Sequence, residues 1–216
     1  MAGTTVDEDN LVYKTLLTAI NNAGNTLTLE QVLAEGAGKE KKQAIRSILS
    51  VYLNIADEKL TDEIYDNFIE QLGAAYQHFE VKPQHNAVQL FNKLKEQNIL
   101  TVLNTGYNRE TAELLLAKLR WKEGQTFDIL VTASDVPNNR PNPDMIFNAM
   151  KRFGLTDGNS VAKVGDSIID IEEGKNAGCG LTVGITTGAH TKTQLQQANP
   201  DAIIDNLSQL SALVIH

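Results

Sequence analysis

The chain has 216 residues, of which 42% are hydrophobic and 21% are charged, so it is long enough for one full domain and a smaller second one. Its apolar runs are short, and we expect neither a membrane-spanning helix nor a signal peptide. The net charge of -8 argues against nonspecific binding to nucleic acid or to an anionic membrane. The single cysteine, Cys179, excludes an internal disulfide and fits a reducing cytoplasm, and we expect it to be a small core residue.

Residues 11–80 have the apolar spacing of helices and contain no convincing strand. The first helix is expected to stop at residues 22–25, and Thr28 with Gln31 resembles the capping box that starts the next one. Two further helices are expected around residues 44–52 and 64–79. The acidic run at residues 7–10 lacks the glycine and the terminal glutamate of an EF-hand loop, so we expect a solvated hinge or a helix start there.

After residue 82, short apolar strands alternate with amphipathic helices. Strands are expected at 99–103, 128–132, 161–164, 181–185 and 202–204, with helices at 85–97, 109–120, 143–153, 168–177 and 191–198. This alternation has the spacing of βαβ units. It predicts an α/β fold with a Rossmann-like parallel sheet that carries helices on both faces.

Ligands of such sheets bind beyond the carboxyl ends of the strands. The residues that follow the expected strands include a hydroxyl (Thr105), a glycine (Gly106), a cation (Arg140) and two carboxylates (Asp166 and Asp170). Carboxylates hold the hard ion Mg²⁺, and a hydroxyl together with backbone N–H groups can bind a phosphoryl oxygen. A cation neutralises the charge that develops during phosphoryl transfer. The set therefore favours a magnesium–phosphate site.

Each of these residues also has a structural interpretation. Asp166 could be a helix N-cap, and Asp170 could be a first-turn carboxylate near the positive end of the helix dipole. Arg140 could be a surface arginine before the turn ordered by Pro141 and Pro143. Taken together, the carboxylates after a strand and the proline-ordered loop favour metal binding and an aimed cation.

Four short motifs follow one another along the chain: Ala2-Gly3-Thr4-Thr5, Asn104-Thr105-Gly106-Tyr107, Arg140-Pro141-Asn142-Pro143, and Gly165-Asp166-Ser167 followed by Asp170. Their order resembles the four motifs of the haloacid dehalogenase (HAD) superfamily, and most closely those of its phosphonatase-like branch. The resemblance covers nearly the whole chain. It implies a phosphohydrolase that works through an aspartyl intermediate and uses Mg²⁺.

The resemblance also assigns roles by position. The Ala2 carbonyl and the Asp166 carboxylate would ligate Mg²⁺, with Asp170 as a second ligand or as a partner that orients a ligand. Thr105 and Arg140 would be catalytic, one bonding the phosphoryl group and the other lying beside the nucleophile. Thr4 and Gly106 belong to the motifs that bind the substrate phosphate.

The nucleophile of this branch is the aspartate of an Asp-x-Ala-Gly-Thr-Thr motif, and it would directly precede Met1. The apolar strand that leads into it would lie at the centre of the sheet, so we expect two neighbouring strands to have unpaired backbone groups. A start site placed too late, inside the motif, is the simplest explanation. Taken literally, the chain should not form an aspartyl intermediate.

In this family a helical cap is inserted between the first two motifs. Residues 11–81 fit that insertion, which leaves residues 1–10 and 82–216 for the core domain. Lys41 stands where the phosphonate-cleaving members carry the lysine that forms a Schiff base, and its cationic neighbours Lys39, Lys42 and Arg46 would favour its neutral form. Ala44 stands where those members tend to carry a histidine, so we expect Lys41 to contact a phosphate ester.

The sequence thus predicts a Mg²⁺-dependent hydrolase of a small phosphorylated metabolite, in the cytoplasm, as a monomer or a homodimer. The first alternative is a carbon–phosphorus bond hydrolase that acts on phosphonoacetaldehyde. The second is a catalytically inactive, truncated phosphate-binding fragment. We expect no nucleic-acid and no membrane partner.

Overall fold

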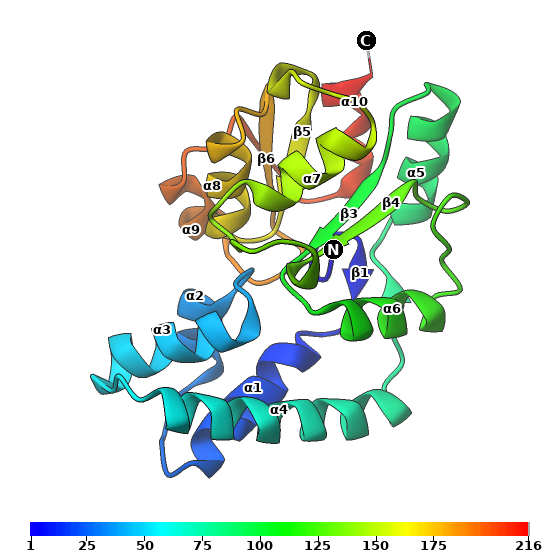
Figure 1. Ribbon diagram of the computed structural model, residues 1–216. Helices are drawn as coiled ribbons and strands as arrows, with labels where there is room; N and C mark the ends of the chain where they lie inside the picture. Colours follow the sequence, from blue (N-terminus) through cyan, green and yellow to red (C-terminus); the bar gives the residue numbers. More distant parts are fainter. Residues whose placement is uncertain (216) are drawn as a thin grey trace.

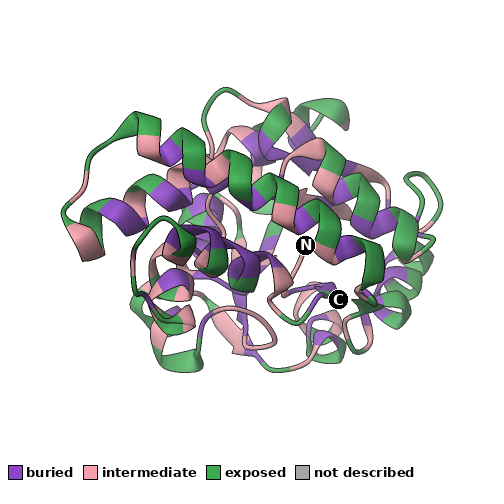
Figure 2. Cartoon of the chain, turned by 90° about the horizontal axis from the view of Figure 1, so that it is seen from below, coloured by how far each residue is buried: buried purple, intermediate pink, exposed green. Residues whose placement is uncertain are grey.

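A computed structural model describes residues 1–215 and shows a helical lobe beside an α/β part (Figure 1). The lobe contains α1 (Leu11–Asn22), α2 (Leu29–Gly36), α3 (Lys41–Leu53) and α4 (Glu58–His78). Their apolar stripes bury side chains such as Leu16, Ile45 and Phe68, and the buried and exposed bands are visible along the helices in Figure 2. The predicted capping box is present, since Gln31 N donates to Thr28 Oγ1 at 3.3 Å and Thr28 N donates to Gln31 Oε1 at 2.9 Å.

The α/β part has the predicted alternation. Its strands are β3 (Val102–Thr105), β4 (Ile129–Thr132), β5 (Ala162–Gly165), β6 (Leu181–Ile185) and β7 (Ala202–Ile204). Its helices are α5 (Ala87–Glu96), α6 (Arg109–Lys118), α7 (Asp144–Arg152), α8 (Ile168–Asn176), α9 (Lys192–Gln197) and the short α10 (Ser211–Val214). The first strand was predicted at residues 99–103, but it begins later, at Val102. The apolar residue Leu100 lies before the strand and is 47% exposed. Among the described residues, no helix combines the length and the apolar character that a membrane crossing requires.

Two short strands that the sequence analysis did not find lie where the lobe joins the α/β part. β1 (Val6–Asp7) pairs antiparallel with β2 (Lys82–Pro83), with Val6 opposite Pro83. Two residues are too few to show an alternating pattern. This pairing brings the two chain crossings between the lobe and the α/β part side by side.

The parallel strands form two separate ladders. β3 pairs with β4, and β5 pairs with β6, which pairs in turn with β7. Within residues 1–215 no ladder joins β3 to β5. The registers place Thr105 beside Thr132 and Gly165 beside Gly184, so paired strands end level with each other in each ladder.

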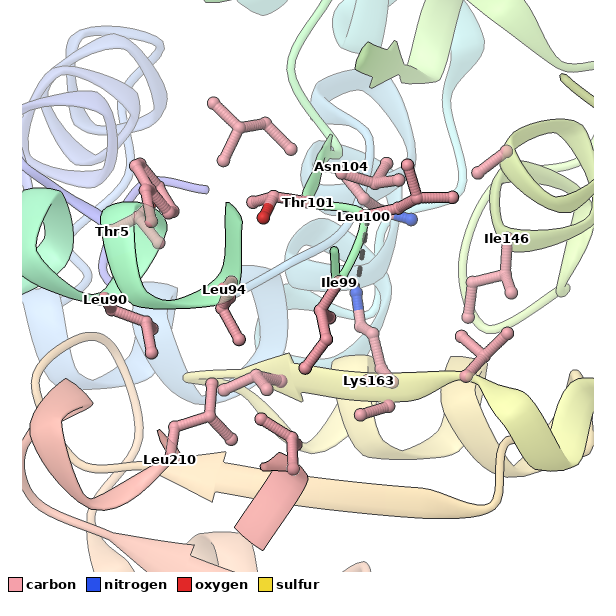
Figure 3. Close-up of a pocket in the computed structure, with 18 of the residues that line it drawn as sticks. Thr5, Leu90, Leu94, Ile99, Leu100, Thr101, Asn104, Ile146, Lys163 and Leu210 are labelled. Atoms are coloured by element: carbon pink, nitrogen blue, oxygen red, sulfur yellow. Dashed lines mark hydrogen bonds between the residues drawn. The ribbon is translucent and has the colours of Figure 1, made fainter. Parts of the chain in front are cut away.

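A cavity of about 510 Å³ lies between the two ladders (Figure 3). Its walls are mainly apolar and include Val102 of β3, Val164 of β5 and Ala149 of α7. Met1 lines the same cavity, and its backbone nitrogen donates to the Asn104 carbonyl at the carboxyl end of β3 at 3.1 Å. The cavity thus separates β3 from β5, which are not paired within residues 1–215.

We predict that filling this cavity costs little. Ala149 lines it, whereas Ala112 of α6 is fully buried in the continuous core and does not line it. Ala149→Leu should leave the free energy of unfolding unchanged or raise it, because the added methylenes enter empty space. Ala112→Leu should lower it by about 1–3 kcal/mol through overpacking. Urea unfolding of the two variants measures the difference, and equal losses would contradict the description of the cavity.

Candidate active site

The candidate site is built at the carboxyl ends of β3 and β5. Thr105 ends β3, Asp166 directly follows β5, and Asp170 lies in the first turn of α8. Arg140 comes from the loop before α7 and is buried at 3% exposure, so its interpretation as a surface arginine is wrong. The elements that carry these residues lie on the side of the α/β part that faces the helical lobe (Figure 1).

Four buried charged side chains form a closed network at this edge. Arg140 contacts Asp170 through Nη1 at 3.0 Å and Glu173 through Nε at 2.7 Å. Lys163 of β5 contacts the same two carboxylates, at 3.0 Å and 2.7 Å. Asn104 bonds to the network from β3, accepting a hydrogen bond from Arg140 and another from Lys163 at 3.3 Å, of which Figure 3 shows the latter. Two cations thus neutralise two carboxylates, which is what burial of charge requires.

The network sets the protonation of its own carboxylates. Burial alone would raise the pKa of Asp170, but the charges of Arg140 and Lys163 outweigh burial and hold the pKa of Asp170 well below its usual range. The same two cations lower the pKa of Glu173 against its burial. Ser167 Oγ also donates to Asp170 Oδ2 at 2.6 Å. Asp170 is therefore an ionised carboxylate with both oxygens engaged.

Asp166 lies in a cradle of its own. Thr4 Oγ1 donates to its Oδ1 and the Ala189 backbone nitrogen donates to its Oδ2, both at 2.9 Å. A Cβ atom at Gly3 or Gly188 would overlap the Asp166 carboxylate, so the backbone approaches it closely on two sides. Burial and the charge of Asp170 raise the pKa of Asp166. The N-cap position of α8 belongs to Ser167, so the interpretation of Asp166 as a helix cap is wrong.

The carboxylates fit a magnesium ion in their chemistry. Mg²⁺ is bound in proteins through one or two carboxylates while it keeps several waters. Asp166 and Asp170 repel one another, and a cation beside Asp166 would relieve that repulsion. No group of three or more His, Cys, Asp or Glu side chains suited to a metal occurs within residues 1–215.

The remaining predicted residues of the phosphate site lie nearby. Ala2 forms an isolated β-bridge with Val6 at the start of the loop that carries Thr4. Thr105 is buried at 3% exposure, and its hydroxyl accepts a hydrogen bond from the Tyr107 backbone nitrogen at 3.2 Å. A Cβ atom at Gly106 would lie 2.6 Å from the Gly38 carbonyl, so the α/β part and the lobe approach each other closely at Gly106.

Lys41 enters the site from the lobe, at the first residue of α3. It is buried at 5% exposure, and its Nζ donates to the Lys39 carbonyl at 2.6 Å. Burial lowers its pKa to about 8, and among nearby cations Arg140 adds to that effect. Lys39 and Lys42 are paired instead with Glu35 and Asp62, so burial, and not the expected crowding by these cations, is the main cause.

The sequence patterns assigned no role to Lys163 and Glu173 of the charge network. They also assigned none to Glu8 or to Tyr107, whose hydroxyl bonds to Glu8 and whose ring lies 5.1 Å from the Lys41 Nζ. Lys163 had a visible signal, because it is a charged residue in the middle of a strand that is otherwise apolar. Glu173 and Glu8 looked like ordinary helix and linker carboxylates. Cys179, expected in the core, is only partly buried, and burial raises its pKa to about 11, which fits an unreactive thiol.

Known proteins that resemble this chain include a protein family and a curated relative. A family model described as haloacid dehalogenase-like hydrolase matches residues 1–185. Phosphonoacetaldehyde hydrolase from Bacillus thuringiensis (strain Al Hakam) is 33% identical over 139 residues, which are 64% of this chain and 52% of that protein. The match thus spans about half the length of this curated relative.

Solved structures share the fold. A hydrolase from Pseudomonas syringae has a TM-score of 0.86 at 19% identity, covering 98% of this chain and 94% of that one. A phosphonoacetaldehyde hydrolase-like protein from Oleispira antarctica has a TM-score of 0.84 at 24% identity, covering 99% and 88%. These identities support the fold alone.

We predict that Gly106→Ala forces the lobe away from the site. Its Cβ atom would lie 2.6 Å from the Gly38 carbonyl and 3.0 Å from the Lys39 carbonyl, and backbone atoms cannot turn aside as a side chain can. The free energy of unfolding should fall by about 1–3 kcal/mol. Gly73→Ala is the matched control. Gly73 is exposed within α4, and an added Cβ atom would meet nothing within 4 Å, so this variant should raise the free energy of unfolding by about 0.5–1 kcal/mol. A neutral Gly106→Ala in urea unfolding would show that the lobe does not press on this glycine.

Proposed function

The chain belongs to the haloacid dehalogenase-like hydrolase family, and on that premise we propose that its site hydrolyses a small phosphorylated metabolite with the help of Mg²⁺. One observation carries the proposal. At the carboxyl end of β5, Asp166 is bonded to the Thr4 hydroxyl and Asp170 is paired with Arg140, and all four side chains are buried. Such groups suit a phosphoryl ligand and a divalent cation.

In this proposal Asp166 is the principal carboxylate for Mg²⁺, with the Ala2 carbonyl as a further ligand. Asp170 is the second carboxylate or, given its bonds to two cations and Ser167, the residue that orients the site. When bound, the ion would act as a Lewis acid and neutralise charge on the phosphoryl oxygens. The Thr4 hydroxyl fixes the Asp166 carboxylate through a hydrogen bond. Gly3 and Gly188 allow the backbone to approach that carboxylate closely.

The other residues would bind and orient the phosphoryl group. Thr105 and the backbone N–H groups beside Gly106 are proposed to donate hydrogen bonds to the phosphoryl oxygens. Arg140 is proposed to balance the negative charge of the site. The attacking carboxylate of the family pattern would form the new P–O bond as the ester P–O bond breaks, and water would then release phosphate. That carboxylate would directly precede Met1 and is not among the 216 residues.

We propose that α1 to α4 form a cap over this site, with residues 11–81 as the cap domain and residues 1–10 and 82–216 as the core. Support comes from the buried contacts across the boundary: Arg140 Nη1 donates to the Gly38 carbonyl at 3.3 Å, and Gln43 Nε2 donates to the Arg140 carbonyl at 3.1 Å. A closed cap excludes water from the reacting groups and supplies residues that select the substrate.

Lys41 favours one alternative, cleavage of a carbon–phosphorus bond in phosphonoacetaldehyde. A buried amine whose pKa is lowered to about 8 is neutral in a larger fraction at neutral pH and can attack an aldehyde. The condensation would release water and leave a Schiff base that accepts the electrons of the broken bond. Ala44 lies on α3 close to Lys41 and carries no proton-transferring group, so we place an ester substrate first.

The test compares three chains. One is the present chain. The other two carry an extension before Met1 that consists of five apolar residues followed by Asp in one chain and by Asn in the other. The cavity between the ladders could accommodate this extension as a strand. With Mg²⁺ and p-nitrophenyl phosphate, only the chain ending in Asp should turn over. Asp166→Asn in that chain should lower the rate at least about 100-fold.

The alternatives have their own outcomes. Turnover by none of the three chains, with phosphate binding retained, would favour a phosphate-binding module over an enzyme. A borohydride-trapped adduct with phosphonoacetaldehyde at Lys41, absent from Lys41→Arg, would favour the carbon–phosphorus hydrolase.

A further inference from the structure

Glu8 is a buried carboxylate at the junction between the lobe and the α/β part. It is 3% exposed, whereas the neighbouring residues Asp7 and Asp9 are exposed. The expected helix start is present, since α1 begins at Leu11, but the expected solvation is wrong at Glu8, although Asp7 and Asp9 are exposed. One Glu8 oxygen accepts a hydrogen bond from Tyr76 of α4, and the other accepts one from the Tyr107 hydroxyl at 2.5 Å. Glu8 thus joins the linker, the lobe and the loop after β3.

Tyr107 connects Glu8 to Lys41. The Lys41 Nζ lies 5.1 Å from the ring centroid of Tyr107 and 5.1 Å from that of Tyr13. The two rings form a box around the amine, whose hydrogen bond goes to the Lys39 carbonyl. The same Tyr107 side chain therefore presents its ring to Lys41 and its hydroxyl to Glu8.

The pair is also linked by charge. Burial raises the pKa of Glu8 to about 7, opposed by its hydrogen bonds to Tyr107 and Tyr76 and by the charge of Lys41. Burial lowers the pKa of Lys41 to about 8, opposed by the charges of Glu40 and Glu8. Other titratable or charged groups face this pair from each surrounding element: Tyr13 on α1, Glu40 before α3, Tyr76 on α4, Tyr107 after β3, Arg140 before α7 and Asp166 after β5.

Retaining Glu8 here costs stability. The pKa of Glu8 is raised from 4.5 to about 7, so between these two pH values the folded protein binds more protons than the unfolded chain. Stability from this group is therefore lost as the pH rises through that window. A glutamine or leucine at position 8 would avoid this pH-dependent loss of stability. A carboxylate kept at such a cost, beside a buried amine, is typical of a functional site.

We propose that Glu8 is a positioning residue for Lys41, orienting the aromatic box through Tyr107 and holding a proton on the amine through its own negative charge. When both groups are ionised, they neutralise each other. A rise in pH converts Lys41 to a neutral amine, and a fall in pH converts Glu8 to a neutral acid. Any effect on turnover rests on the proposed function, but the coupling of the two groups does not.

The test is a ¹³C NMR titration of the whole chain labelled at the ε-carbon of lysine and the δ-carbon of glutamate. The Lys41 signal is assigned by its loss in Lys41→Met, and the Glu8 signal by its loss in Glu8→Gln or in Glu8→Asp. In the natural chain Lys41 should titrate well below the other lysines. In Glu8→Gln, which keeps the size of the side chain but removes its charge and replaces one acceptor oxygen with a donor NH2 group, the Lys41 midpoint should fall by roughly half a pH unit or more.

Asp9→Asn is the matched control. Asp9 is an exposed carboxylate of the same linker, and this variant should leave the Lys41 midpoint unchanged. Because coupling is reciprocal, Lys41→Met should raise the Glu8 midpoint by a comparable amount. That second titration decides the matter even if Glu8→Gln does not fold.

The proposal is overturned if Lys41 titrates with the other lysines, or if its midpoint is the same in folded Glu8→Gln. It is equally overturned if the titration midpoint of Glu8 is the same in Lys41→Met as in the natural chain. None of these readouts needs turnover, so failure of the proposed hydrolase would leave the coupling result intact.

Discussion

Neutralisation of buried charge is the constraint on which the site depends. Arg140 and Lys163 share the carboxylates of Asp170 and Glu173, and none of the four side chains is more than 7% exposed. Removing one member would leave a buried charge without a partner, which costs far more than the loss of a surface ion pair. The network therefore fixes the loop before α7, the strand β5 and the first turns of α8 relative to one another. Asp166 is held in place within that frame.

The helical lobe is fitted to this frame by polar contacts as well as by packing. The segment around Gly38 accepts a hydrogen bond from Arg140, approaches Gly106 closely and provides the carbonyl that binds Lys41. Glu8 ties the linker to both parts through two tyrosines. A ligand at the strand ends would therefore contact groups whose protonation depends on the position of the lobe.

The sequence was sufficient to predict the order of the main helices and strands and to suggest candidate site residues at the strand ends, because both steps use local patterns. Apolar spacing gave the helices of the lobe, and the rule that ligands bind at strand ends selected Asp166 and Asp170. It could not predict which residues would share a charge network: nothing in the local sequence indicates that Lys163 and Glu173 meet Arg140. The environment of Glu8 depends on Tyr76 and Tyr107, which lie 68 and 99 residues away, so the linker looked merely acidic. The cavity between the ladders likewise depends on tertiary packing.

The central claim is that Asp166 and its neighbours form one site for a divalent cation. Binding of Mn²⁺, as a paramagnetic substitute for Mg²⁺, can be followed by electron paramagnetic resonance of the chain, of Asp166→Asn and of Asp205→Asn, whose exposed carboxylate is a control. Our interpretation predicts one saturable site that is lost in Asp166→Asn and kept in Asp205→Asn. Saturable binding that is unchanged by Asp166→Asn, or no binding by the folded chain even with phosphate present, would contradict it.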